Sequence, residues 1–182
     1  MFNFELSLIG NGRIRKFVEL CLGYAPKYIF TDCPSSSSGK YHPEDELGGN
    51  GCVIHTCRVV KLVCLLIDGM KDFDHRDEAI AAAIIHDLRK QGMEKSGRTV
   101  ANHPDLAASL VYEVATLHPD VVDSDVVDAL YNAVGYHYGQ WGTGNWVCKD
   151  FYNSDIDRLS KVVHVADYLA SRKEIGNRLK SK

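Results

Sequence analysis

Two adjacent residues, His86 and Asp87, close an almost wholly apolar stretch that runs from Ala79 to Ile85. An imidazole and a carboxylate buried side by side in such a stretch are costly unless something binds them, and a divalent metal ion is the usual solution. The pair therefore indicates metal chemistry.

Two further residues of metal-ligand type stand beside predicted apolar helix faces. His55 is in line with Val59 and Leu62 at helical spacing, and Asp167 adjoins a stripe that includes Ala170. Either residue alone is more often a satisfied core residue than a ligand. With the pair, they supply four N and O donors from three helices, which suits one octahedral ion with open positions for water. Because adjacent helical residues diverge by about 100°, the pair reaches one ion only beside a helix end.

The elements that must position these donors are predicted to be helices. Ala-rich and Leu-rich segments are separated by Gly, Pro and Asn, and the sequence has no sustained alternation of period two. The predicted fold class is therefore all-α, with a single compact helical domain over residues 1–182. The last two helices have candidate N-caps at 123–124 and 153–154. The predicted helices span 11–24, 51–69, 76–91, 102–117, 123–138 and 154–174.

A long loop over residues 26–51 precedes the helix that carries His55. Pro34, four consecutive serines, Pro43 and a pair of glycines interrupt any regular element in this segment. Long loops in compact domains are usually functional or disordered, and the aromatic residues of this one favour an ordered loop that packs on something. We expect an active-site loop.

Composition limits the classes of function. The chain has 182 residues and a formal net charge of -3, which argues against a binder of extended nucleic acid, because such binding needs many phosphate contacts from an excess of Lys and Arg. The apolar runs are too short to cross a membrane and the N-terminus is a poor secretion signal, so we expect a cytoplasmic protein without a membrane partner. The six cysteines lack the paired spacing of a structural zinc site and are expected to be reduced thiols. Cys52 is weighed as a metal ligand and assigned to the core.

The order of the four donors along the chain, His, then His-Asp, then a distant Asp, resembles that of the HD-domain metal-dependent phosphohydrolases. The resemblance extends from about Ser35 to Arg172 and includes the segments GKYHP at 39–43 and ADYLASR at 166–172. A bare His-Asp pair is weak evidence for this family, whereas the ordered set is strong. The metal ligands that the resemblance implies are His55, His86, Asp87 and Asp167.

Some members of that family hold two metals and place further histidines between the pair and the last Asp. His103 and His137 occupy those places here, although His103 also fits a solvated helix start and His137 an aromatic cluster. We favour two metals, bridged by Asp87, because a spacing of about 4 Å suits in-line phosphoryl chemistry. The expected cofactor is one or two divalent ions, chosen from Mn2+, Fe2+, Co2+, Ni2+ and Mg2+.

Phosphate recognition needs cations near the metal. Lys90, one turn beyond the pair, matches the Lys that follows the pair in the family, and we expect it to act with Asp87 in catalysis. Lys40 and His42 in the loop are weaker candidates for closing over the substrate. Arg172 is a candidate for contacting phosphate or for anchoring the last helix. The sequence leaves the oligomeric state open.

The expected function is hydrolysis of a phosphoester bond by metal-activated water. Tyr136, Tyr138, Trp141 and Trp146 surround His137 and favour stacking on a nucleobase, so a nucleotide or related small phosphorylated substrate is the expected partner, with ordinary core packing the equal alternative. Two other functions remain open, a di-iron oxygenase of HD type and a non-catalytic nucleotide-binding sensor. The basic loop after the pair favours phosphate, and the complete ligand set disfavours the sensor.

Overall fold

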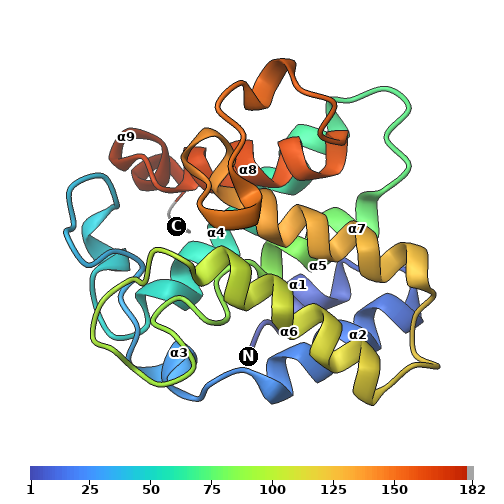
Figure 1. Ribbon diagram of the computed structural model, residues 1–182. Helices are drawn as coiled ribbons and strands as arrows, with labels where there is room; N and C mark the ends of the chain where they lie inside the picture. Colours follow the sequence, from blue (N-terminus) through green and yellow to red (C-terminus); the bar gives the residue numbers. More distant parts are fainter. Residues whose placement is uncertain (180–182) are drawn as a thin grey trace.

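Helix α5 (Arg76–Ile85) lies at the centre of the molecule because its sequence is apolar on every face (Figure 1). Every residue from Ala79 to Ile85 is fully buried, as expected for a helix that is hydrophobic all round. The helices that pack against it are α2 (Gly12–Tyr24), α4 (Gly51–Asp68), α7 (Ser124–Gly135) and α8 (Arg158–Ala170). The computed structural model describes residues 1–179, and within them no strand is present, which confirms the all-α prediction.

Helix α6 (His103–Leu117) packs on α7 and on α2 at the outside of this bundle. Short helices occupy the ends of the chain and the long connections. They are α1 (Asn3–Ser7), α3 (Tyr28–Thr31), α9 (Lys173–Gly176) and the 3-10 helices η1 (Glu44–Glu46), η2 (Tyr136–Trp141), η3 (Gly144–Trp146), η4 (Phe151–Asn153) and η5 (Asn177–Leu179). None of these short elements was predicted from the sequence.

Capping decides where α8 begins. The prediction of an N-cap at 153–154 is wrong, because the hydroxyl of Ser154 donates to the carbonyl of Phe151 (2.6 Å) and closes η4 instead. The cap is Asp157, whose carboxylate accepts from the backbone N–H of Ser160 at 2.7 Å. The predicted cap of α7 is confirmed in position only, since Asp123 precedes the helix without a capping bond from its side chain.

Three predicted helices end earlier than expected. The helix predicted over 76–91 ends at Ile85, and turns follow through residue 95. The helix predicted over 123–138 ends at Gly135 and continues as η2. The helix predicted over 154–174 ends at Ala170. The first of these early ends places His86 and Asp87 directly beyond a helix, which is the position that two neighbouring ligands require.

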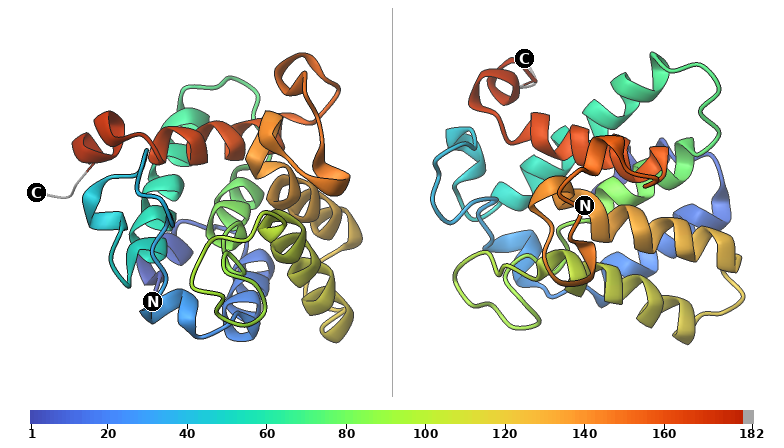
Figure 2. Two further views of the ribbon diagram at one scale, coloured as in Figure 1. Left: turned by 60° about the vertical axis from the view of Figure 1, so that its left-hand side comes forward. Right: turned by 45° about the horizontal axis from the view of Figure 1, so that its top comes forward.

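The segment 26–51 is tied to the rest of the fold. The hydroxyl of Tyr28 donates to the carbonyl of Gly92 (2.6 Å), and the backbone N–H of Cys52 donates to the carbonyl of Cys33 (2.8 Å). Figure 2 shows this segment beside the C-terminal end of α8 and α9, where Pro43 packs against Gly176. The segment therefore packs against the rest of the domain, and its role as an active-site loop remains a prediction.

All six cysteines are free thiols, as predicted. The sulfur of Cys52 lies 3.6 Å from that of Cys33. Within residues 1–179, no helix has both the length and the apolar character needed to cross a bilayer.

Candidate metal centre

Three buried histidines, His86, His103 and His137, are oriented by the same local contact. In each, Nδ1 lies near the backbone carbonyl three residues earlier, at 2.8, 2.9 and 2.6 Å respectively. A carbonyl can only accept, so Nδ1 carries the proton and Nε2 presents a lone pair. This tautomer is the one that a metal-ligating histidine adopts when its other nitrogen donates to a carbonyl.

The first group of candidate ligands consists of His55 on α4, His86 at the end of α5 and Asp167 on α8. Their ligand atoms all lie within 4.8 Å of one another. Nε2 of His55 is 2.8 Å from Oδ1 of Asp167, and Nε2 of His86 is 3.8 Å from the same oxygen. Three elements far apart in the sequence thus bring donors to one point.

The second group consists of Asp87, His103 at the start of α6 and His137 in η2. Nε2 of His103 lies 3.1 Å from Oδ1 of Asp87, and Nε2 of His137 lies 3.9 Å from it. Both imidazoles are fully buried, at 0% and 1% exposed. His103 is therefore not a solvated helix start.

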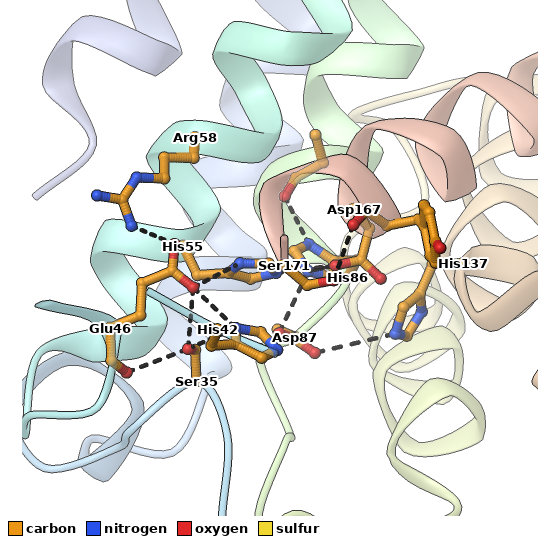
Figure 3. Close-up of polar contacts among 12 residues, drawn as sticks. Ser35, His42, Glu46, His55, Arg58, His86, Asp87, His137, Asp167 and Ser171 are labelled. Atoms are coloured by element: carbon orange, nitrogen blue, oxygen red, sulfur yellow. Dashed lines mark hydrogen bonds and ion pairs between the residues drawn. The ribbon is translucent and has the colours of Figure 1, made fainter. Parts of the chain in front are cut away.

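Asp87 joins the two groups, as Figure 3 shows. Its Oδ1 faces the second group, while its Oδ2 lies 3.2 Å from Nε2 of His86 in the first. The geometry separates the six predicted ligands into two sets of three with a shared carboxylate between them. This arrangement fits the expectation of two bridged ions better than that of one ion held by four residues.

The donor set fits divalent cations because, without them, its polar atoms are poorly satisfied. Nε2 of His86 and Oδ1 of Asp87 are buried and have no hydrogen-bond partner among the described residues. The two Nε2 atoms of His103 and His137 face each other at 3.1 Å. Buried acceptors that face one another repel unless a cation or a proton lies between them. Mixed imidazole and carboxylate donors suit first-row divalent ions.

The charge states of the second group also suit a cation. Burial alone would raise the pKa of Asp87, but the charge of Lys90 and the neighbouring imidazole of His86 hold it well below its usual range. Burial, together with the neighbouring His103 and His86, lowers the pKa of His137 to about 3. At neutral pH, Asp87 is therefore ionised and His137 neutral, which are the forms that bind metals.

His55 has stronger anionic neighbours than the other histidines. Burial alone would lower its pKa, but the carboxylates of Asp167 and Glu46 raise it to about 9. Burial would likewise raise the pKa of Asp167, and His55 holds it below its usual range. Before any cation is bound, these two residues form an ion pair.

Glu46, which the sequence analysis missed, is the buried carboxylate behind His55 (Figure 3). Its Oε2 accepts from Nδ1 of His42 (2.8 Å) and from the hydroxyl of Ser35 (3.1 Å), and it lies 3.2 Å from Nδ1 of His55. Its Oε1 pairs with the guanidinium of Arg58. Nothing in the acidic run at 44–46 marks the third residue as the buried one.

A cavity of about 370 Å³ adjoins the centre, with His137 and Asp167 in its wall. Three cationic residues, Lys90, Arg98 and Arg172, also line it. The guanidinium of Arg98 has no ion-pair partner among the described residues and was not singled out from the sequence. The volume lies at the lower end of the roughly 300–1,000 Å³ typical of small-molecule sites.

The predicted substrate-binding residues differ in their positions. Lys90, His42 and Arg172 line the cavity, whereas Lys40 is exposed and lies outside the lining. The ammonium of Lys90 pairs with Asp87, and the guanidinium of Arg172 lies 4.5 Å from the ring centroid of Tyr41. Contact of any of these residues with substrate remains a prediction.

The four aromatic residues predicted near His137 divide into two pairs, and stacking of any of them on a nucleobase remains a prediction. Tyr138 and Trp141 line the cavity. Trp146 is buried in the core, and its ring centroid lies 4.9 Å from that of Tyr136. Its indole N–H donates to the carboxylate of Asp105. Trp146 is therefore a core residue, and the partly buried Tyr136 packs against the core.

Two further residues of the cavity wall were not predicted from the sequence. Tyr168 stacks on Trp141, and Nδ1 of His164 donates to the backbone carbonyl of His137 at 2.8 Å. Tyr168 stands beside the ligand Asp167 in the sequence, a position that marks it for the same site. No comparable pattern marks His164.

The family model for the HD domain matches residues 52–172, which is more than half of the chain. The chain belongs to the HD domain family. HD domains are generally metal-dependent hydrolases, and the two ligand groups of this HD domain lie within the matched range. Neither curated proteins nor solved structures gave a significant match. His42 and Glu46 precede the matched range and belong to the part of this HD domain that the family model does not describe.

Proposed function

We propose that this HD domain is a metal-dependent phosphohydrolase that acts on a small phosphorylated substrate, with a nucleotide as the leading class. The observation that carries the proposal is the meeting of two ligand groups and three cationic side chains at one cavity. Cations beside a metal centre are what a phosphoryl group requires, because its charge is spread over several oxygens.

Divalent ions at such a centre supply a water that ionises near neutral pH and an electrophile for the phosphoryl oxygens. The other contributions to the reaction come from the protein's own side chains. Asp87 contacts both groups, through Oδ2 to His86 and through Oδ1 to His103, and so fixes their positions relative to each other. Lys90 pairs with Asp87 on the cavity side. Burial alone would lower the pKa of this ammonium, but the charge of Asp87 raises it above its usual value. Lys90 therefore stays charged and can donate to a phosphoryl oxygen.

A nucleotide is favoured by the aromatic side of the cavity. Trp141 and Tyr168 stack with ring centroids 5.5 Å apart and an interplanar angle of 15°. Trp141 remains 51% exposed. A ring that is already held flat offers a nucleobase a platform at small entropic cost, and stacking of this kind tolerates any base. The small cavity suits a mononucleotide-sized ligand better than an extended strand.

The test is elemental analysis of the purified protein, followed by a screen for phosphate release from nucleotides and cyclic nucleotides with Mn2+, Co2+ or Mg2+. We expect release that depends on the added metal. Tightly bound iron near two equivalents with oxygen-dependent chemistry and no release would support the oxygenase instead. Nucleotide binding without turnover by the metal-loaded protein would support the sensor.

A further inference from the structure

His55 differs from the other three histidines of the centre in how its ring is oriented. It lies inside α4, where the backbone carbonyls are taken up by amides four residues later. His86, His103 and His137 instead sit at a helix end or in a 3-10 turn, where a nearby carbonyl receives Nδ1. Nδ1 of His55 therefore needs a partner from another part of the chain.

Glu46 provides that partner. Its Oε2 faces Nδ1 of His55 at 3.2 Å, as an ion-pair contact rather than a well-aligned hydrogen bond. The other oxygen of this carboxylate, Oε1, forms an ion pair with the guanidinium of Arg58. An ionised carboxylate only accepts, so Nδ1 of His55 must carry the proton and Nε2 is left for Asp167 and the metal side.

Glu46 is itself held by its backbone. Its carbonyl accepts from the backbone N–H of Ser35 at 2.9 Å and from the hydroxyl of the same residue at 3.1 Å. The side chain is completely buried and lies outside the lining of the cavity. The carboxylate is thus placed to act on His55 rather than on a substrate.

We infer that Glu46 is a positioning residue that fixes the tautomer of His55 and joins the metal centre to the loop that walls the cavity. The inference rests on the proposed metal centre. The same Oε2 accepts hydrogen bonds from His42 and Ser35, and both of these residues line the cavity. Metal binding and the order of this loop are therefore coupled, and the coupling acts equally in both directions.

The first test compares Glu46→Gln with Asp45→Asn. Asp45 contacts the same guanidinium of Arg58 at 2.6 Å, so both variants remove one charge from one cluster. A glutamine of equal size has one acceptor oxygen in place of two, so it cannot accept from His42, His55 and Arg58 together. We expect titration with Mn2+ to give about 10- to 100-fold weaker binding for Glu46→Gln, as for other residues that orient a ligand, and binding within about twofold of wild type for Asp45→Asn.

The proton on Nδ1 of His55 is detected by 15N NMR of the metal-free protein. In the wild type, His55 should be protonated at Nδ1 with its Nε2 proton shared with Asp167. In Glu46→Gln, the signal of Nδ1 should shift toward an unprotonated nitrogen. Metal affinity and Nδ1 protonation both equal to wild type would overturn the inference.

A second variant leaves every side chain of the cluster in place. A Cβ at Gly51 would collide with the carbonyl of Glu46 and lie 2.9 Å from the backbone nitrogen of Ser35, whereas Gly23, also in a helix, faces open space. Gly51→Ala should displace Glu46, weaken Mn2+ binding and speed hydrogen exchange of the Ser35 amide. Gly23→Ala should do none of these. Faster exchange with unchanged affinity would contradict the coupling.

The wild-type protein alone also tests the coupling, if the variants do not fold. Addition of Mg2+ should slow hydrogen exchange, followed by mass spectrometry, in the segment 33–47, and unchanged exchange with metal bound would contradict the inference. If the wild type binds no divalent metal, the proposed function fails, and the NMR measurement alone decides the role of Glu46. If it binds metal but hydrolyses nothing, the affinity comparison still decides.

Discussion

Lys90 and Asp87 form a buried ion pair at the edge of the cavity. Such an ammonium can stabilise a phosphoryl group, and a charged hydrogen bond of this kind contributes about 1.5–3 kcal/mol. We therefore predict that Lys90→Met lowers kcat/KM for phosphate release by about 10- to 150-fold. Metal content, measured by elemental analysis, should stay near that of the wild type because Lys90 is not a ligand.

Lys95→Met is the matched control for that prediction. Lys95 lies on the same basic segment but pairs with Asp32 in an exposed position. Its replacement should leave turnover within about twofold of wild type, since exposed ion pairs contribute about 0–1 kcal/mol. Equal losses in the two variants would show that the segment acts through its general charge rather than through Lys90.

Trp141 is the residue that we expect to stack on the base of a nucleotide substrate. Base stacking is worth about 1–3 kcal/mol, so Trp141→Ala should raise KM for a nucleotide by about 5- to 150-fold. It should change KM for a phosphoester without a base by much less. Tyr24→Ala is the control, because Tyr24 is 48% exposed and lies outside the cavity. Equal effects on both substrates would remove the argument for a nucleobase.

At the scale of an element, η2 depends on Gly139. This residue has φ 55° and ψ -124° and lies between the predicted ligand His137 and the cavity residue Trp141. A Cβ there would lie 2.5 Å from the ring of His164. Gly139→Ala combines backbone strain of about 1–3 kcal/mol with overpacking of similar size. We predict that urea denaturation will give a free energy of unfolding lower by about 2–6 kcal/mol.

Gly144→Ala separates these two causes. Gly144 also has a positive φ, of 58°, but a Cβ there would meet nothing within 4 Å. Its replacement should cost only the backbone strain, about 1–2 kcal/mol. If both variants lose the same free energy of unfolding, the contact with His164 contributes nothing to the stability of η2.

The elements also show which parts of the fold a sequence can reveal. The buried helix α5 is evident because its residues from 79 to 85 are all apolar, and the donors that interrupt such faces stand out for the same reason. Glu46 and Arg98 do not stand out, because an acidic run and a basic loop are both typical of solvated surface. In the structure, Glu46 is buried and Arg98 lines the cavity. The start of α8 was missed because several capping residues competed within five positions.

At the scale of the whole molecule, the two ligand groups gather side chains from α4, the end of α5, α6, η2 and α8. Each of these elements contributes one or two donors, and no single helix holds a site alone. Bound ions would therefore cross-link most of the bundle. A ligand that binds the folded state only, at 100 times its Kd, stabilises it by about 2.7 kcal/mol.

This cross-linking predicts a large effect of metal removal on thermal stability. For a chain of 182 residues, about 2.7 kcal/mol corresponds to a shift in Tm of about 5–11 °C, which EDTA should remove and Mn2+ at 100 times its Kd should restore. Asp87→Asn should abolish the shift, because the carboxylate shared by both groups is lost. Asp123→Asn, at an exposed carboxylate that pairs with Arg13, should retain it in full. A Tm that responds to the metal equally in wild type and Asp87→Asn would place the stabilising ion elsewhere in the molecule.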